Sequence, residues 1–206
     1  MIRRMKCQAL PILLAAAGLF AAGGTVSAQP RSPRSVEWGL SLGFNSTSMD
    51  LLGERAIFDF YGGLSLEVRL ADRLALGSGL VYTRKGGDGS LPSWGMLTVV
   101  TPVSVRVQYL ELPLILKFSP SRGLYLEGGV YGAVKVGGSM TVRLGGDSGD
   151  LINGTDAGYV LGIGGEMRLF GRRQYTGFRY SHGLTGVLST GDYRHSTFTY
   201  LIGVYF

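Results

Sequence analysis

The stretch Phe198-Thr-Tyr200-Leu-Ile202-Gly-Val204-Tyr-Phe206 ends the sequence and alternates large apolar side chains with smaller or more polar residues. A period of two places its large apolar side chains on one face of a β-strand. A chain that stops inside an apolar strand would leave an exposed sheet edge unless that strand closes the sheet. We therefore expect this strand to complete a transmembrane barrel, with Phe206 as the signal for membrane assembly.

The N-terminal residues have the features of a secretory signal peptide. Arg3, Arg4 and Lys6 precede an apolar run over residues 9–22, and the small residues Val26-Ser27-Ala28 follow it. A basic segment, an apolar segment and a small-residue cleavage site in this order predict a leader over residues 1–28. Residues 29–206 then form one outer-membrane β-barrel domain, because they are too few for two domains of typical size.

Composition excludes several classes of protein. The formal charge is +6, but three of the positive charges lie in the leader and the remaining bases are scattered, which argues against nucleic acid as a partner. Cys7 is the only cysteine and also lies in the leader, so disulfides and cysteine metal sites are excluded. No apolar run after residue 28 is long enough for a spanning helix. A hydrophobic content of 45% with 34 glycines instead indicates short alternating strands.

Eight segments alternate in this way, and they predict an all-β, eight-stranded antiparallel up-and-down barrel. They are residues 36–44, 60–70, 74–82, 103–118, 124–136, 159–169, 175–184 and 198–206. In the fourth segment the apolar positions change from odd to even numbers between Tyr109 and Leu112. A slip of one residue predicts a β-bulge there, beside Pro113, which cannot donate to a sheet ladder.

The connections between these segments alternate in length. Residues 71–73, 119–122 and 171–174 are short, whereas residues 45–58, 84–102, 137–157 and 185–197 are long and rich in Gly, Ser, Asp and Thr. Transmembrane barrels have short periplasmic turns and long extracellular loops. We therefore expect a Gram-negative outer-membrane location with both termini in the periplasm.

Alternation alone does not decide which face points outward. A soluble, lipocalin-like barrel would place its apolar side chains inside, around a ligand. Here the more polar face is rich in glycine and alanine, which suit a crowded, narrow lumen and weaken a strand that faces water. The pattern favours an apolar face in contact with lipid.

Four segments together resemble the PorT-like group of outer-membrane-protein β-barrel domains. They are GLVYTRKG at 79–86, YLELPLILKF at 109–118, GGVYG at 128–132 and FRYSHGL at 178–184. The resemblance covers most of residues 36–206 and implies an eight-stranded barrel of the Gram-negative outer membrane. Proteins of the PorT type are linked to a secretion system, so the resemblance also allows an accessory role in secretion.

Ten charged residues fall on the face expected to line the lumen: Glu37, Glu67, Arg69, Glu111, Lys117, Glu127, Lys135, Glu166, Arg168 and Arg179. Five are acids and five are bases. Eight strands enclose an interior just wide enough for side chains, and unpaired charges there are costly. We expect a structural plug of ion pairs, and a gated ion path is the alternative.

Catalysis, metal binding and cofactor binding are not expected. His182 and His195 each adjoin a serine, but neighbouring residues on a strand point to opposite faces and cannot form a dyad. The acidic residues of the third long connection, Asp147, Asp150 and Asp156, lack the full ligand set of a calcium loop.

The expected role is structural, surface-interacting or accessory to an envelope complex. The alternatives are a narrow gated pore for small solutes or ions and a lipid-modifying outer-membrane enzyme. The expected partners are outer-membrane lipid, lipopolysaccharide and the barrel-assembly machinery, and other envelope proteins are further candidates.

Overall fold

The computed structural model describes residues 35–49, 56–92, 100–142, 146–147, 153–186 and 194–206. The leader expected over residues 1–28 lies outside these ranges, as does Asp150. Within the described ranges, no helix is long and apolar enough to cross a membrane.

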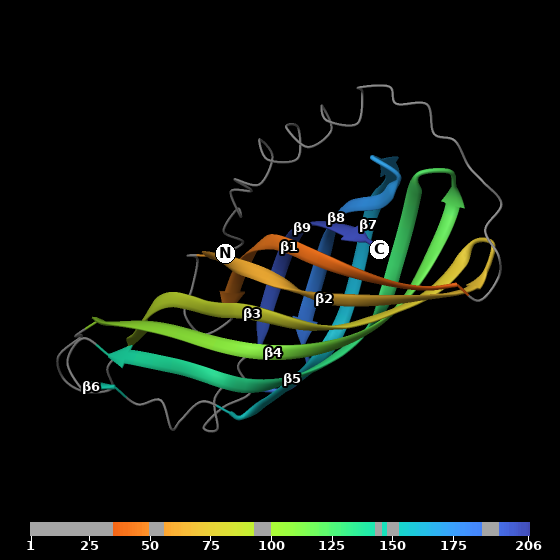
Figure 1. Ribbon diagram of the computed structural model, residues 1–206. Helices are drawn as coiled ribbons and strands as arrows, with labels where there is room; N and C mark the ends of the chain where they lie inside the picture. The colour runs from red at the N-terminus through yellow and green to blue at the C-terminus, as the bar shows by residue number, and fades with distance from the viewer. Residues whose placement is uncertain (1–34, 50–55, 93–99, 143–145, 148–152, 187–193) are drawn as a thin grey trace, which may run out of the picture.

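The described chain is built from strands that close on themselves (Figure 1). Each strand pairs with its neighbours in antiparallel fashion, β4 pairs with β5, and β1 pairs with β9 to complete the circle. The expected eight-stranded antiparallel barrel is confirmed. Its strands are β1 (Val36–Met49), β2 (Ile57–Ala71), β3 (Leu74–Pro92), β4 (Val100–Ser121), β5 (Leu124–Val142), β7 (Thr155–Leu169), β8 (Arg172–Gly183) and β9 (His195–Tyr205). A two-residue strand, β6 (Gly146–Asp147), pairs with the tip of β5.

Three two-residue turns lie at one end of the barrel, together with the start of β1 and the finish of β9. We call this the turn end, and the opposite one the loop end. The turns are Asp72-Arg73, Arg122-Gly123 and Phe170-Gly171, as the pairings of their flanking residues show. Phe170 and Gly171 both have positive φ, at 52° and 76°, as a type I′ hairpin turn requires.

The expected strands are correct in number and position, but several are too short at the loop end. β3 continues to Pro92 and β4 begins at Val100, although residues 84–102 were expected to form a loop. The two strands keep one continuous register from Leu74↔Phe118 to Pro92↔Val100. β3, β4 and β5 therefore form the longest part of the sheet, which extends beyond the other strands in Figure 1.

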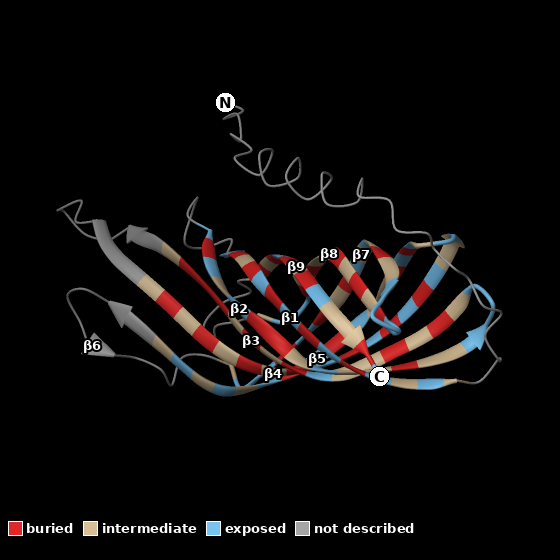
Figure 2. Cartoon of the chain, turned by 45° about the horizontal axis from the view of Figure 1, so that its top comes forward, coloured by how far each residue is buried: buried red, intermediate tan, exposed pale blue. Residues whose placement is uncertain are grey.

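Large apolar side chains point away from the barrel axis. Trp38, Leu42 and Phe44 on β1 and Phe198 and Ile202 on β9 are all exposed. Figure 2 shows the result as alternating bands of buried and exposed residues along each strand. The apolar face is thus the outer one, as expected, and the barrel is not built around an apolar ligand cavity in the manner of a lipocalin.

The side-chain alternation of β4 corrects one expectation. Odd-numbered residues face inward from Val105 to Lys117 without a break, and Val105, Val107 and Tyr109 are buried. The predicted change of face is therefore wrong, because the inner face of β4 itself changes from polar to apolar toward the loop end. A register shift does occur, but it lies against β5, where Gln108 pairs with Gly137 and Tyr109 with Lys135.

Pro113 is accommodated without a bulge beside it. The β3–β4 register shows no pairs between Ser78↔Leu114 and Val81↔Glu111, and proline has no N–H to donate at this point. Instead the Ser78 hydroxyl donates to the Pro113 carbonyl oxygen at 2.9 Å. The local loss of ladder bonding is thus offset by a side chain.

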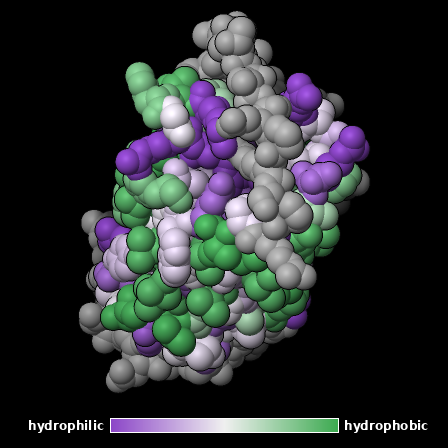
Figure 3. Space-filling model, turned by 45° about the vertical axis from the view of Figure 1, so that its right-hand side comes forward, coloured by the Kyte–Doolittle hydropathy of each residue, from purple (hydrophilic) through white to green (hydrophobic). Residues whose placement is uncertain are grey.

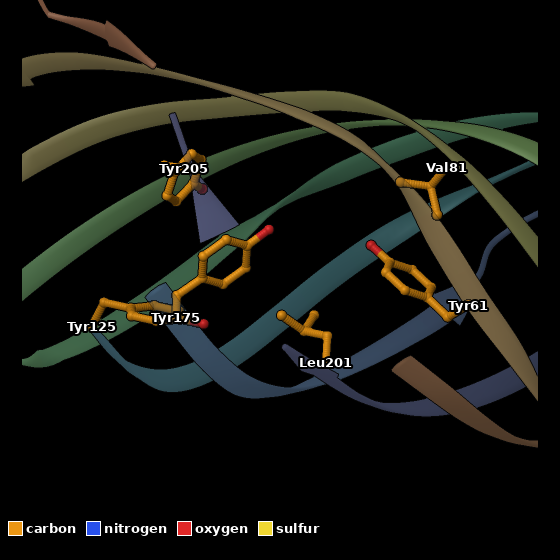
Figure 4. Packing of buried hydrophobic residues seen from close by; sticks show 6 residues of the cluster. All are labelled: Tyr61, Val81, Tyr125, Tyr175, Leu201 and Tyr205. Atoms are coloured by element: carbon orange, nitrogen blue, oxygen red, sulfur yellow. The ribbon is translucent and has the colours of Figure 1, made fainter. Parts of the chain in front are cut away.

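Aromatic rings occupy much of the barrel interior. A cluster of buried side chains comes from β2, β3, β5, β8 and β9 and points inward (Figure 4): Tyr61, Val81, Tyr125, Tyr175, Leu201 and Tyr205. The rings of Tyr175 and Tyr205 stack with their centroids 4.8 Å apart. The interior is therefore packed with side chains.

An arginine at Leu80 tests the outward, membrane-facing placement of the apolar face. Leu80 is 47% exposed near the middle of the outer band of β3. In a bilayer, Leu80→Arg should lower the free energy of unfolding by about 2 to 4 kcal/mol, whereas Leu70→Arg near the turn end should cost about 0 to 1 kcal/mol. Urea unfolding in phospholipid vesicles measures both values. Equal costs at the two positions would contradict the placement.

Candidate functional site: the charged barrel interior

Arg173 is the centre of an ion-pair network near the turn end. Arg173 is the second residue of β8, and its side chain is only 4% exposed. Its guanidinium lies 2.5 Å from Glu67 Oε1 on β2 and 3.0 Å from Glu166 Oε2 on β7, and it also pairs with Glu37 on β1. Four strands are joined by one cation. Because this group is buried and multiply bonded, it fixes their side chains to one another.

Lys117 on β4 connects the same network to the far side of the barrel. Its Nζ donates to Glu67 Oε2 at 2.9 Å and to the Tyr205 hydroxyl at 3.1 Å, and it lies 3.9 Å from Glu166 Oε1. Tyr205 belongs to β9, which is separated from β4 by three strands. Lys117 therefore bridges the lumen from wall to wall. The same ammonium lies over the Tyr125 ring, 4.7 Å from its centroid, which is favourable for a cation.

A second ion pair lies closer to the middle of the barrel. Arg179 on β8 forms a fork with both carboxylate oxygens of Glu127 on β5, through Nε and through NH2 at 3.2 Å. Its remaining NH1 donates to the Tyr61 hydroxyl at 2.9 Å. The strand β7 lies between β5 and β8. This pair again joins strands that are not neighbours.

A third group lies toward the loop end. Lys85 Nζ is 3.0 Å from Glu111 Oε2 and 3.5 Å from Asp156 Oδ2. Asp156 Oδ2 is 3.2 Å from His195 Nε2, and the Tyr131 hydroxyl lies within hydrogen-bond distance of both. Thr185 donates to the other Asp156 oxygen at 2.9 Å. Asp156 is thus held by partners from three strands and a loop segment.

Most of the ten expected lumen charges belong to these groups. The structure places eight of them in ion pairs within the barrel: Glu37, Glu67, Arg69, Glu111, Lys117, Glu127, Glu166 and Arg179. Lys135 shares the inward parity of Tyr131 and Ala133 and is half-buried nearer the loop end. Arg168 is different. It pairs with Arg173 in the β7–β8 ladder and shares the inward parity of Glu166, but its side chain is exposed at the turn-end rim, so its assignment to the buried network is corrected.

Four network residues were missed because they fell in expected connections. Arg173 was assigned to a turn, although β8 begins at Arg172 and puts Arg173 on the inner face. Lys85, Asp156 and His195 were assigned to long loops, but each lies in a strand that extends farther than expected. Continuing the alternation of the expected segment 74–82 beyond its end could have identified Lys85, because Val81, Thr83 and Lys85 are all odd-numbered inner positions.

The paired interior limits the chemistry that this site can perform. Acids and bases both line the described part of the lumen, among them Glu37, Glu67, Glu111, Glu127, Glu166, Asp156, Arg69, Lys85, Lys117, Lys135, Arg173 and Arg179. No set of three or more His, Cys, Asp or Glu side chains in the described ranges is arranged to hold a metal ion. The arrangement neutralises charge within a packed barrel and links opposite walls.

One serine–histidine contact lies on the outer face instead. His182 Nδ1 is 3.0 Å from Ser196 Oγ, because the two residues are direct partners on β8 and β9. The expectation considered only sequence neighbours and missed this cross-strand pair. In the described part of the chain, no carboxylate hydrogen-bonds to His182, and its ring instead packs 5.6 Å from the Tyr159 ring. A hydroxyl–imidazole pair without an orienting acid lacks the third member of a catalytic triad.

The match to one protein family agrees with this architecture. Residues 27–189 match the family described as outer membrane protein beta-barrel domain. Similar solved structures include Ail, the attachment invasion locus protein of Yersinia pestis, in complex with the heparin analogue sucrose octasulfate (12% identity, covering 83% of this chain and 99% of that chain, TM-score 0.47). Others are Neisserial surface protein A (17% identity, 83% and 97%, TM-score 0.49) and OprG from Pseudomonas aeruginosa (13% identity, 83% and 94%, TM-score 0.40). None of the curated proteins matches the chain in sequence.

Two arginines five residues apart test the network. Arg173→Gln leaves three carboxylates short of their shared cation, and breaking a buried pair in this way should lower the free energy of unfolding by about 3 to 5 kcal/mol. Arg168→Gln removes an exposed charge from the same hairpin and should leave stability unchanged within error. Urea unfolding of both variants in vesicles gives the comparison. A large loss for Arg168→Gln and none for Arg173→Gln would overturn the corrected assignment.

Proposed function

We propose, from the premise that the chain belongs to the family of outer membrane protein beta-barrel domains, that this outer-membrane barrel is a closed scaffold. In this proposal the barrel conducts little or nothing, anchors the chain, and presents its loop end for interaction. An accessory role within an envelope complex, including the secretion role that the PorT-like resemblance implies, is one form of this function.

The contact between Lys117 and Tyr205 carries the proposal. These side chains meet at 3.1 Å from opposite walls of the barrel. Arg173 and Glu67 meet at 2.5 Å from β8 and β2 in the same region. A water-filled path through this layer would have to separate buried charged groups from their partners, which is costly. These contacts therefore support a plug more than an open pore.

The loop end supplies the interacting part of the proposed scaffold. β3, β4 and β5 contain 19, 22 and 19 residues, whereas β8 and β9 contain 12 and 11. The longer strands carry a rigid sheet beyond the rest of the barrel (Figure 1). Binding residues are commonly held on loops by such a rigid support. We propose that this end faces the cell exterior and that both termini face the periplasm.

A narrow gated pore is the alternative function. Lys117 has carboxylates at 2.9 and 3.9 Å, and Lys85 has carboxylates at 3.0 and 3.5 Å. A cation with two acceptors can exchange one for the other without becoming unpaired. Such exchanges would give an ion path that opens only in part. We favour the plug because the lumen-crossing contacts coexist with packed aromatic rings. We also propose that the chain has no enzymatic activity, since among the described residues no acid orients the His182–Ser196 pair.

Planar-bilayer recording distinguishes plug from pore. The unmodified barrel should show little or no steady conductance, because the lumen is crossed by bonded side chains. The double variant Lys117→Ala, Tyr205→Ala removes the crossing contact and should raise the frequency of conducting events, whereas Arg168→Ala should not. A stable wild-type channel with the conductance of a porin would contradict the closed-scaffold proposal.

Cysteine labelling in intact cells tests the orientation. With Cys7 replaced by serine, Gly154→Cys places a thiol at an exposed loop-end position with no heavy atom within 4 Å of the new Cβ. Asp72→Cys places one at an exposed turn-end position. A membrane-impermeant maleimide should label Gly154→Cys directly and Asp72→Cys only after the outer membrane is opened. The reverse pattern would mean that the termini face the exterior.

A further inference from the structure

Arginines surround the turn end of the barrel. Every two-residue turn has at least one within a residue of it: Arg73 between β2 and β3, Arg122 between β4 and β5, and Arg168 and Arg172 on either side of the β7–β8 turn. All four are exposed. We call these four residues the arginine collar. Because the three hairpins follow one another around the barrel wall, the collar is distributed around the circumference.

The arginine collar differs from the arginines of the loop end in its pairing. Toward the loop end, Arg84 lies 3.5 Å from Asp59, and Arg106 lies 3.3 Å from Asp88. Within the described ranges, no member of the collar has a carboxylate within salt-bridge distance. Asp72 is the only acid in the three turns, and its backbone carbonyl accepts a hydrogen bond from Arg69. The turn end therefore has an excess of exposed positive charge.

Exposed apolar side chains lie directly beside the arginine collar. Phe170 is 92% exposed at the tip of the β7–β8 turn, and Phe206 is 60% exposed. The Arg172 guanidinium lies over the Phe206 ring, 4.4 Å from its centroid. Leu124 and Leu169 are also exposed next to collar residues. The side carrying the hairpins comes forward in Figure 3, where hydrophilic atoms adjoin a broad hydrophobic area.

This combination fits the headgroup region of a membrane. Guanidinium groups bind phosphate through two parallel hydrogen bonds and remain charged under all conditions. Aromatic rings are favoured at the membrane–water interface, where one side of the ring is apolar and the other wet. A row of apolar side chains that ends in unpaired arginines therefore matches acyl chains that end in phosphates. An acidic protein would satisfy the arginines but not the exposed rings between them.

We propose that the arginine collar binds the phosphate groups of anionic phospholipids in the leaflet that meets the turn end. The binding rests on the membrane-embedded barrel, and only the identity of that leaflet depends on the proposed orientation. Lipid bound in this way would favour a fixed depth of the barrel, since all four arginines lie at the turn end, whereas Arg84 and Arg106 toward the loop end already pair with carboxylates.

Trp38 offers a local reporter for this binding. It is 62% exposed on the outer face of β1 near the turn end, and the only other tryptophan is Trp94. In a Trp94→Phe background, the barrel is reconstituted in phosphatidylcholine vesicles that contain either brominated phosphatidylglycerol or brominated phosphatidylcholine at equal mole fraction. Both leaflets contain the quencher, so the result does not depend on orientation or on conductance.

We expect the phosphatidylglycerol probe to quench Trp38 with roughly a two- to fivefold higher apparent affinity, as exposed charge pairs of this kind allow. Replacing all four collar arginines with glutamine should remove the preference, and the pair Arg168→Gln, Arg172→Gln should reduce it. The matched control Arg84→Gln, Arg106→Gln should keep it. High salt should weaken it by screening.

Equal quenching by the two probes, or a preference that survives in the fully substituted but folded barrel, would overturn the proposal. A heat-modifiable gel shift establishes that each variant is folded. If binding fails while the barrel remains closed in bilayer recordings, the collar proposal is wrong and the scaffold proposal stands.

Discussion

Closure of the sheet between β1 and β9 is the constraint on which the rest of the structure depends. The pairing runs from Gly39↔Tyr205 to Met49↔His195 and removes the last sheet edge over this length. In a bilayer there is no water to satisfy an open edge, so closure is obligatory for a strand-built span. Closing the sheet with eight strands also sets a narrow diameter. The interior must then be filled by side chains of the right size and charge.

Tyrosine rings that pack against glycines of neighbouring strands fill part of the interior. A Cβ added to Gly203 would collide with the Tyr175 ring, and one added to Gly164 or Gly177 would collide with the Tyr125 ring or its hydroxyl. These glycines are therefore needed for the close approach of a ring to a neighbouring strand, as in aromatic rescue of strand glycines. The rings in turn surround Lys117, whose ammonium lies 4.8 Å from the Tyr175 centroid. Glycine on the inner face is thus a condition for burying the cation.

The sequence was sufficient for the fold and for most of the inward charges because a period of two encodes the face of each residue directly. It was insufficient at the strand ends. Val105 and Val107 are apolar yet face inward, so side-chain polarity did not indicate the face of the strand there. The β-bulge expected in β4 was therefore misplaced. Arg168 and Arg173 are direct backbone partners across the β7–β8 hairpin, but one is exposed and the other buried. The alternation gives both residues the same face and does not show which of them lies exposed at the rim, because strand boundaries are the least predictable feature of a pattern. Cross-strand partners such as His182 and Ser196 require the register, which no single segment contains.

The network and the closure are mutually dependent. Arg173 on β8 and Glu67 on β2 are separated in the sheet by β9 and β1, so their 2.5 Å contact exists only when those two strands are joined. Before closure this contact cannot form, and a charge that lacks its partner among lipid chains costs several kcal/mol. An open sheet carrying these residues is therefore disfavoured in the membrane relative to the closed barrel. The charges that fill the lumen therefore also make a partly inserted, open barrel unfavourable. Pairing of β1 with β9 and pairing of these charges occur together.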